Sequence, residues 1–193
     1  MPKILIDSLM TLESYARERT NFRARVIEHK KHRTLQLGDS VTLIFEDELT
    51  MRYQIQEMLR AERIFEERGI QEELETYNPL IPDGRNFKAT MMLEYPDPEE
   101  RQRWLAKLIG IEDKAWIRVG SLERVEAIAD EDLERENEQK TSAVHFLRFE
   151  LTESMAHALK SGEGLSVGID HPQYQASVDM PAAVRDALVK DLA

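Results

Sequence analysis

The chain has 193 residues, enough for one domain or two small ones with a hydrophobic core. Its formal net charge of -11 disfavours nucleic acid and anionic membrane surfaces as partners, because phosphate binding depends on Lys and Arg. The chain has no cysteine, which excludes disulfides and cysteine-ligated metal centres, so any metal would need His, Asp and Glu. No apolar stretch near the start is long enough for a signal peptide or a spanning helix, so we expect a cytoplasmic protein.

The first 88 residues are expected to be mainly helical. One helix is predicted over residues 11–32, with a threonine cap at its start and basic residues at its end. A second is predicted over Glu46–Gly69, where apolar residues recur on one face at helical spacing and Gly69 is the expected end. Between the two helices, residues 34–46 alternate in polarity after a Gly-Asp turn, and this pattern predicts a strand or a hairpin.

A carboxylate interrupts the apolar face of the second helix. Glu62 projects from the middle of this face, which continues to Phe65, and Glu66 lies at its edge. Burying an unpaired charge is costly, and Arg19 projects from the apolar face of the first helix. We therefore predict that Arg19 and Glu62 form a structural ion pair between the helices. The alternative is that Glu62 and Glu66 bind a ligand or a hard metal ion.

The other side of the second helix is basic. Arg52 lies there, with Tyr53 nearby, and arginines on such a face can hold a carboxylate or a phosphate with two hydrogen bonds. A solvated face with charged residues spaced four apart explains the same pattern. We favour this second interpretation and keep Arg52 and Tyr53 as candidate binding residues.

A polar loop follows between residues 77 and 86, where Asn-Pro and Pro-Asp-Gly sequences prevent a regular element. The loop carries Asn78, Asp83 and Arg85 as candidate binding residues. Loops with many polar side chains often bind ligands. The chemistry of tight turns also explains the choice of Asn, Pro, Asp and Gly here, and this interpretation is favoured.

The second portion of the chain, residues 89–193, changes to strands and shorter helices. Residues 89–133 and 143–193 both predict the order strand, helix, strand, strand, which indicates an internal duplication with a period of about fifty residues. The acidic segment near residues 130–140 is expected to be an exposed helix or a linker. Together with residues 1–88, this portion is expected to form one compact unit.

Two histidines of the second portion are candidate metal ligands. His145 lies on a predicted strand, and His171 lies at a predicted hairpin turn. The candidate metal site combines these two histidines with Glu62, because imidazole and carboxylate groups suit first-row transition metals. A histidine beside a proline in a turn is usually structural or exposed, so a metal site is the less favoured interpretation. No cofactor is predicted otherwise.

Four runs of the sequence carry a family resemblance: FEDELTMRYQIQEMLRAERIFE, IQEELETYNPLIPDGRNFKATMMLEYPDPEER, KTSAVHFLRFEL and VGIDHPQY. They resemble an uncharacterised bacterial family that is classed only as a domain of unknown function. The resemblance covers the whole chain, and the run from Tyr77 to Gly84 is its most specific part. It implies redox protein partners, because such proteins are often encoded beside rubrerythrin and a heterodisulfide-reductase-like iron–sulfur protein. It carries over no catalytic residue.

The sequence thus predicts an α+β protein. Long N-terminal helices and a strand precede two β-α-β-β-like halves, whose strands form a mixed or antiparallel sheet with helices packed on it. The leading functional hypothesis is a non-catalytic accessory or binding protein that acts with redox proteins and is able to form a homodimer. The alternative is an enzyme, metal-dependent or carboxylate-based, that uses Glu62 with His145 or His171 on a small polar substrate.

Overall fold

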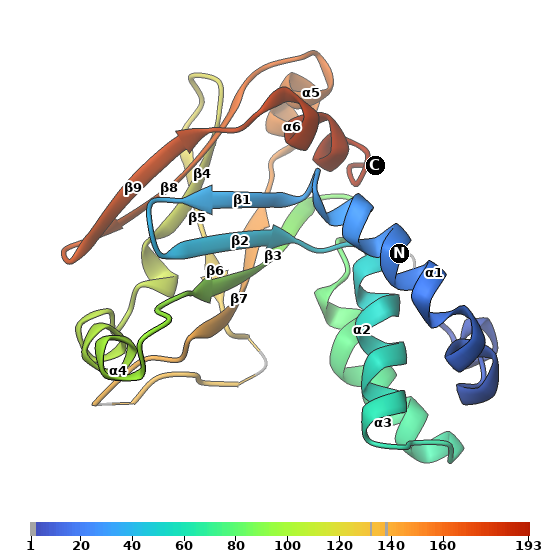
Figure 1. Cartoon of the computed structure of the whole chain (residues 1–193). Helices are drawn as coiled ribbons and strands as arrows, with labels where there is room; N and C mark the ends of the chain where they lie inside the picture. The colour runs from blue at the N-terminus through green and yellow to red at the C-terminus, as the bar shows by residue number, and fades with distance from the viewer. Residues whose placement is uncertain (1–2, 132, 138) are drawn as a thin grey trace.

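Two antiparallel sheets form the centre of the fold (Figure 1). The structure is a computed structural model that describes residues 3–131, 133–137 and 139–193. The first sheet contains, in spatial order, β1 (Thr34–Leu37), β2 (Val41–Phe45), β3 (Asn86–Leu93), β7 (Val144–Glu150) and β6 (Ile128–Ala129). The second contains, in spatial order, β5 (Arg124–Glu126), β4 (Ala115–Val119), β8 (Leu165–His171) and β9 (Tyr174–Asp179).

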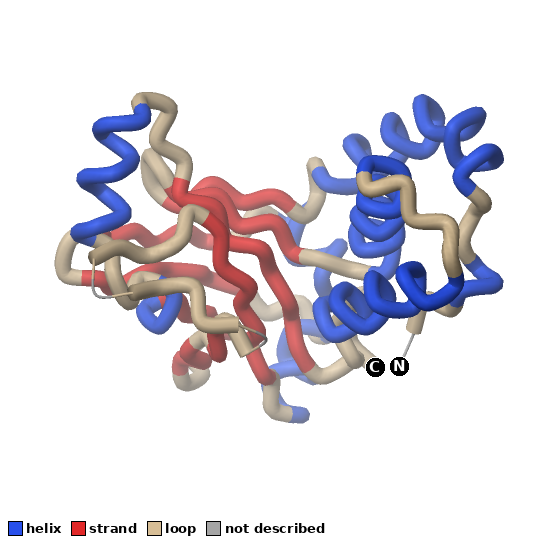
Figure 2. Tube along the Cα trace, turned by 90° about the horizontal axis from the view of Figure 1, so that it is seen from below, coloured by secondary structure: helices blue, strands red, loops and turns tan. Residues whose placement is uncertain are grey.

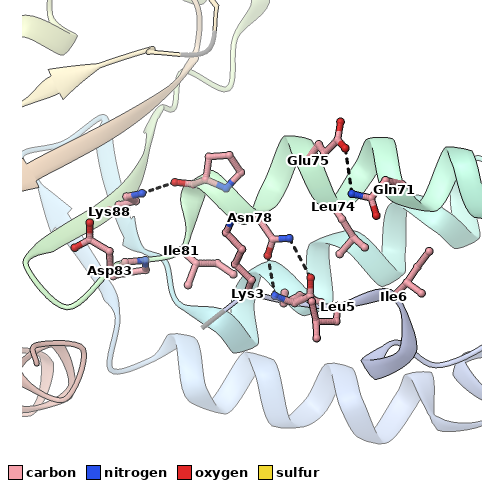
Figure 3. Close-up of a pocket in the computed structure, with 13 residues that line it drawn as sticks. Lys3, Leu5, Ile6, Gln71, Leu74, Glu75, Asn78, Ile81, Asp83 and Lys88 are labelled. Atoms are coloured by element: carbon pink, nitrogen blue, oxygen red, sulfur yellow. Dashed lines mark hydrogen bonds between the residues drawn. The ribbon is translucent and has the colours of Figure 1, made fainter. Parts of the chain in front are cut away.

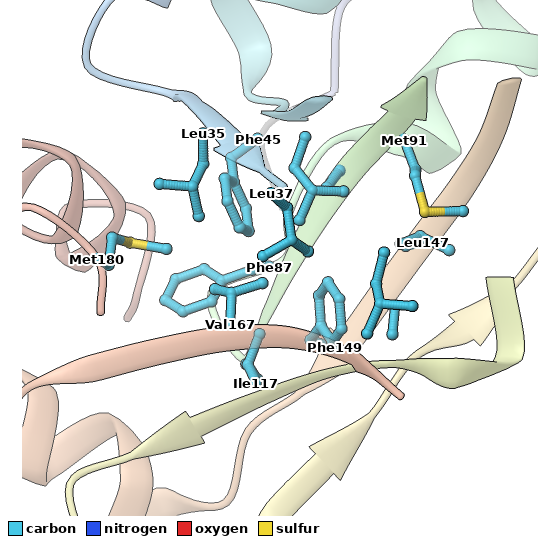
Figure 4. Close-up of a cluster of buried hydrophobic side chains, with 14 of the residues drawn as sticks. Leu35, Leu37, Phe45, Phe87, Met91, Ile117, Leu147, Phe149, Val167 and Met180 are labelled. Atoms are coloured by element: carbon cyan, nitrogen blue, oxygen red, sulfur yellow. The ribbon is translucent and has the colours of Figure 1, made fainter. Parts of the chain in front are cut away.

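The main hydrophobic core lies between the two sheets (Figure 4). Side chains along β3 and β7 alternate between buried and more exposed positions, as expected for strands with one face against a core. Phe87 and Phe149 are partners across β3 and β7, and both are buried in this core. Ile117 of β4 and Val167 of β8 meet them from the second sheet. Each fully buried side chain of this size contributes roughly 1.5–3 kcal/mol.

Three helices pack beyond one end of the first sheet (Figure 2). They are α1 (Leu12–Lys30), α2 (Glu48–Ala61) and α3 (Glu67–Tyr77). Thr11 caps α1, since its Oγ1 accepts a hydrogen bond from Ser14 N over 3.2 Å. The helix α2 contributes to two small apolar clusters, one shared with α1 and the other with α3. It is therefore buried along two of its sides.

Three shorter helices complete the main core. They are α4 (Pro98–Lys107), α5 (Glu153–Lys160) and α6 (Ala182–Val189), and each sends a leucine into the core. Short 3-10 turns cover Ile6–Ser8, Asn78–Leu80 and Glu112–Lys114. The predicted α+β class is confirmed, and the predicted strand of residues 34–46 is a hairpin of β1 and β2.

The long helix predicted over Glu46–Gly69 is wrong, because the chain turns in its middle. Glu62 ends α2, and Arg63 adopts a left-handed φ of 54°, which is uncommon for any residue but glycine. A separate helix, α3, follows the turn, so Gly69 lies inside a helix rather than at its end. Phe65 lies in the turn and is 75% exposed instead of continuing the apolar face.

The two predicted halves meet strand against strand. β3 pairs with β7 in the first sheet, and β4 pairs with β8 in the second. The division into residues 89–133 and 143–193 and the duplication itself stay predictions. β2 pairs with β3, so the first sheet crosses the predicted boundary at residue 88. The described residues between 130 and 140 contain no helix.

Candidate functional site

Arg19 is held by a carboxylate of α2, and that carboxylate is Glu57. Arg19 Nε and Nη2 donate to Glu57 Oε1 and Oε2, each over 2.8 Å, and Tyr15 Oη donates to Oε1 over 2.6 Å. The predicted pair of Arg19 with Glu62 is wrong, because Glu62 lies past the last turn of α2 and is exposed. Hydrogen bonds from Arg19 lower the pKa of Glu57, so its carboxylate is ionised and satisfied at neutral pH.

Arg52 and Tyr53 are engaged by neighbouring segments. Arg52 donates through Nε to Glu48 Oε1 over 2.9 Å and through Nη1 to Ser8 O over 2.6 Å. Tyr53 packs against Phe22 of α1, with 6.0 Å between the ring centroids. These contacts fasten α2 to α1 and to residues 3–11, the N-terminal segment. A role of Arg52 or Tyr53 in ligand binding stays a prediction.

The polar loop lines a cavity of about 380 Å³ (Figure 3). The N-terminal segment, α3 and residues 78–88 form its walls, with Ile4, Leu74 and Ile81 as apolar lining. Asn78 joins two of these walls, since its Oδ1 accepts from Ile4 N over 2.8 Å and its Nδ2 donates to Ile4 O over 3.0 Å. The predicted binding residues Asn78 and Asp83 therefore lie together at one cavity.

Charges of both signs line the same cavity. Lys3 and Lys88 supply the cations, and Glu75 and Asp83 supply the carboxylates. Burial lowers the pKa of Lys88, while the nearby Asp83 opposes this shift. Lys88 Nζ donates to the carbonyl oxygen of Pro79, which orients the side chain along the cavity wall. The site thus offers apolar surface beside groups that can pair with either charge.

Arg85 and Glu66 lie outside this cavity. Arg85 is exposed, and its backbone N donates to Asp83 Oδ1 over 2.9 Å in the turn that shapes the loop. Glu66 immediately precedes α3 and is exposed. It lies instead in a separate surface depression beside the turn between α2 and α3. A binding role for either residue stays a prediction.

The predicted metal set of Glu62, His145 and His171 does not come together. Glu62 is exposed at the end of α2, whereas His145 on β7 and His171 on β8 are both buried. His171 Nε2 lies 3.1 Å from Ile109 O, and its Nδ1 accepts from Gln173 N over 3.1 Å. Both ring nitrogens of His171 are thus engaged by backbone groups, which indicates a structural role in the β8–β9 hairpin.

His145 is the centre of a buried polar cluster beside β7. Its Nδ1 lies 2.6 Å from Asp130 Oδ2 and 3.8 Å from Glu112 Oε1. Its Nε2 lies 3.0 Å from both Thr141 Oγ1 and Ser142 O. The side chain of His145 has no exposed surface, and those of Glu112 and Asp130 are only 7% and 8% exposed.

The two carboxylates of this cluster differ in how they are satisfied. Asp130 Oδ1 accepts from Phe146 N over 2.9 Å and lies 3.3 Å from Arg135 Nη1. Glu112 Oε2 has no hydrogen-bond partner among the described residues, and burial raises the pKa of Glu112. One nitrogen or oxygen atom from each of Glu112, Asp130 and His145 lies within 4.8 Å of the others. Such a donor set can hold a metal cation.

Residues 3–192 match the model of a family described as "Protein of unknown function (DUF3501)". The chain belongs to this family. It is also similar to a crystal structure of a novel protein of unknown function from Burkholderia pseudomallei K96243, with 51% sequence identity over 100% of both chains and a TM-score of 0.95. The family resemblance expected from the sequence is confirmed over nearly the whole chain.

This family member was also compared with curated proteins and searched for membrane-spanning helices. No curated protein matches the chain. None of the helices in the described part of the chain is long and apolar enough to cross a membrane. Neither the family description nor the description of the similar structure names an activity.

The sequence singled out His145 in this family member but missed its two acidic neighbours. Glu112 lies in a 3-10 turn before β4, and Asp130 follows β6. In the sequence, 18 positions separate Glu112 from Asp130, and 15 separate Asp130 from His145. One local signal was available: Asp130 stands directly after a strand, where loop residues often carry function. Among many acidic residues nearby, this signal alone does not distinguish Asp130.

Proposed function

We propose that the protein is a non-catalytic binding protein that takes a small ligand in the cavity between the N-terminal segment, α3 and residues 78–88. The observation that carries the proposal is the cavity itself, about 380 Å³ in volume, with charged and apolar groups on its walls. Sites for small molecules commonly have volumes of roughly 300–1,000 Å³ and combine apolar lining with a few polar groups. The cavity meets both conditions.

The lining favours a zwitterionic ligand with an apolar part, such as an amino acid or a short peptide. Lys3 and Lys88 can pair with an anionic group, and Glu75 and Asp83 can pair with a cationic one. Burial lowers the pKa of Lys88, and an anionic group of a ligand would offset this cost of holding the ammonium charged. Ile81 and its apolar neighbours would contact the remainder of the ligand.

Chemical-shift mapping tests this proposal. We would titrate the ¹⁵N-labelled protein with amino acids and dipeptides and follow its amide signals. A bound ligand is expected to shift the amides of residues 3–6, 74–83 and 88. Lys88→Met should weaken binding at least tenfold, whereas Lys114→Met, the same change at an exposed lysine outside the cavity, should leave it unchanged. Shifts confined to another surface, or equal affinity in both variants, would refute the cavity as the site.

We further propose that the protein acts in the cytoplasm as an accessory of redox proteins. The resemblance of the chain to a family encoded beside rubrerythrin and an iron–sulfur protein supports this proposal. Affinity capture with the tagged protein from its native host tests the partners, and cell fractionation tests the compartment. Enrichment of those two redox proteins is expected, and their consistent absence from the captured fraction would exclude a stable accessory complex.

A further inference from the structure

The buried polar cluster around His145 is separate from the ligand cavity and shares no residue with its lining. We propose that Glu112, Asp130 and His145 bind one divalent transition-metal cation, of the class of Mn²⁺, Fe²⁺ or Zn²⁺. Carboxylate and imidazole donors together suit these ions, because carboxylates favour hard cations and imidazole favours the later metals of the first row.

The orientation of the His145 ring directs Nδ1 to the two carboxylates. Nε2 lies 3.0 Å from Ser142 O, and a backbone carbonyl can only accept, so Nε2 carries the hydrogen in this contact. Histidines that bind metals usually donate their other ring N–H to a carbonyl or a carboxylate in this way. The ring nitrogen left as a ligand is therefore Nδ1, on the side of Asp130 and Glu112.

The distances around Nδ1 suit a shared ion. Nδ1 lies 2.6 Å from Asp130 Oδ2 and 3.8 Å from Glu112 Oε1. Bonds from zinc to nitrogen and oxygen ligands measure about 2.0–2.2 Å, so two atoms on one ion lie within roughly 4.4 Å of each other. Both observed distances fall below this limit. Coordination requires Nδ1 and Asp130 Oδ2 to move apart from 2.6 Å, because two ligand atoms on one tetrahedral ion lie roughly 3.2–3.6 Å apart.

The surroundings of Glu112 favour a metal cation in this cluster over a single proton between His145 and Asp130. A proton on Nδ1 satisfies Asp130 Oδ2 through one hydrogen bond, but it leaves Glu112 Oε2 buried without a hydrogen-bond partner among the described residues. Burying an unpaired carboxylate is costly. A divalent cation attracts both carboxylates at once and removes the need for that partner.

The outer contacts hold the proposed ligands in place. Asp130 Oδ1 accepts from Phe146 N over 2.9 Å, which leaves Oδ2 to face the ring of His145. The backbone of Asp130 adopts a left-handed φ of 47°, a conformation that costs energy in a residue with a side chain. Arg135 Nη1 lies 3.3 Å from Asp130 Oδ1 and stabilises the negative charge of the site.

Metal analysis of the full chain tests the proposal. We would purify the protein without chelator, measure its metals by inductively coupled plasma mass spectrometry, strip it, and then titrate it with Co²⁺ as a spectroscopic probe and with Zn²⁺ in a thermal unfolding assay. One ion per chain, a visible absorption band with Co²⁺ and a higher melting temperature with Zn²⁺ are expected. A folded wild-type protein that binds neither probe would overturn the proposal. The contact of His145 with Asp130 would then be an ordinary hydrogen bond.

Matched variants localise the ion. Glu112→Gln keeps the shape of the side chain and should reduce Co²⁺ affinity at least tenfold, and Asp130→Asn should do the same. Glu62→Gln changes an exposed carboxylate outside the cluster and should leave the affinity unchanged. Circular dichroism shows whether each variant is folded. If Glu112→Gln does not fold, Asp130→Asn provides the test. Unchanged Co²⁺ affinity in a folded variant of either ligand would refute the assignment.

Discussion

Arg33 and Asp191 form a buried ion pair although 158 residues separate them in the sequence. Arg33 Nη1 and Nη2 donate to the two carboxylate oxygens of Asp191 over 2.8 and 2.7 Å, and Arg33 is only 3% exposed. Arg33 Nε also lies 3.0 Å from Oδ2 of Asp47, which caps α2. Arg33 therefore connects the residue before β1 with the start of α2 and with the C-terminal residues of the chain.

We expect Arg33→Ala to destabilise the protein by about 3–5 kcal/mol, because it leaves Asp191 buried without its partner. Burial raises the pKa of Asp191, and Arg33 opposes that shift. In the variant, Asp191 therefore binds a proton more readily, so the loss of stability should shrink as the pH falls. Urea unfolding at pH 7 and pH 5 measures both effects.

The control for this pair is the exposed pair of Arg68 and Glu72, in which the arginine side chain is 90% exposed. Arg68→Ala should leave the urea midpoint almost unchanged, because exposed ion pairs contribute little. Equal effects of Arg33→Ala and Arg68→Ala would show that burial does not govern the strength of the first pair.

Gly168 leaves room for the ring of Trp116 across the second sheet. The two residues are partners in the pairing of β4 with β8, and a Cβ added to Gly168 would lie 2.2 Å from Cζ2 of Trp116. We expect Gly168→Ala to cost about 1–3 kcal/mol in unfolding free energy through this overlap. Gly164→Ala is the matched control, since no described atom lies within 4 Å of the added methyl group. Similar melting temperatures for the two variants would contradict the overlap.

The pair of Arg19 and Glu57 predicts a pH dependence with a definite sign. Hydrogen bonds from Arg19 lower the pKa of Glu57 in the folded state, so the pair stabilises the protein above the ordinary pKa of glutamate, about 4.3. This contribution is lost as the pH falls through the lowered value. Glu57→Gln should therefore reduce the melting temperature at pH 7 and have a smaller effect near pH 3.

Glu62→Gln is the control for this prediction, because Glu62 is exposed and lies outside the pair. Its melting temperature should follow that of the wild-type protein at both pH values. If Glu62→Gln were the more damaging change at pH 7, the assignment of Glu57 as the partner of Arg19 would be wrong.

Local patterns are enough to predict most of the strands and most of the helices of the fold. The Gly38 turn and the alternation of residues 34–46 predict the β1–β2 hairpin, and Thr11 predicts the start of α1. The break at Arg63 has no such signal, since Ala61 and Glu62 before it are good helix formers and no Gly or Pro stands at the break. After the turn, α3 packs against the N-terminal residues Ile4 and Ile6, and that contact is not local in the sequence.

The candidate sites depend on contacts of the same non-local kind. The loop sequence predicts Asn78 as a binding residue, and the structure places it at the cavity, where its side chain pairs with Ile4, 74 residues earlier. The sequence does not single out Glu57, because it lies beside the apolar face of α2 and faces α1. A helix that is buried on two sides cannot be described by one apolar face. Asp130 meets His145 only through the pairing of β6 with β7.

The turn between α2 and α3 predicts that Phe65 contributes little to stability. In one continuous helix, Phe65 would belong to the buried face, and its removal would cost roughly 3–5 kcal/mol. In the structure Phe65 is 75% exposed, so Phe65→Ser should change the unfolding free energy by only about 0.5 kcal/mol. Leu59→Ala, which changes a side chain that is 2% exposed on α2, should cost about 2–5 kcal/mol in the same urea experiment. A large loss for Phe65→Ser would instead indicate that Phe65 is covered in solution.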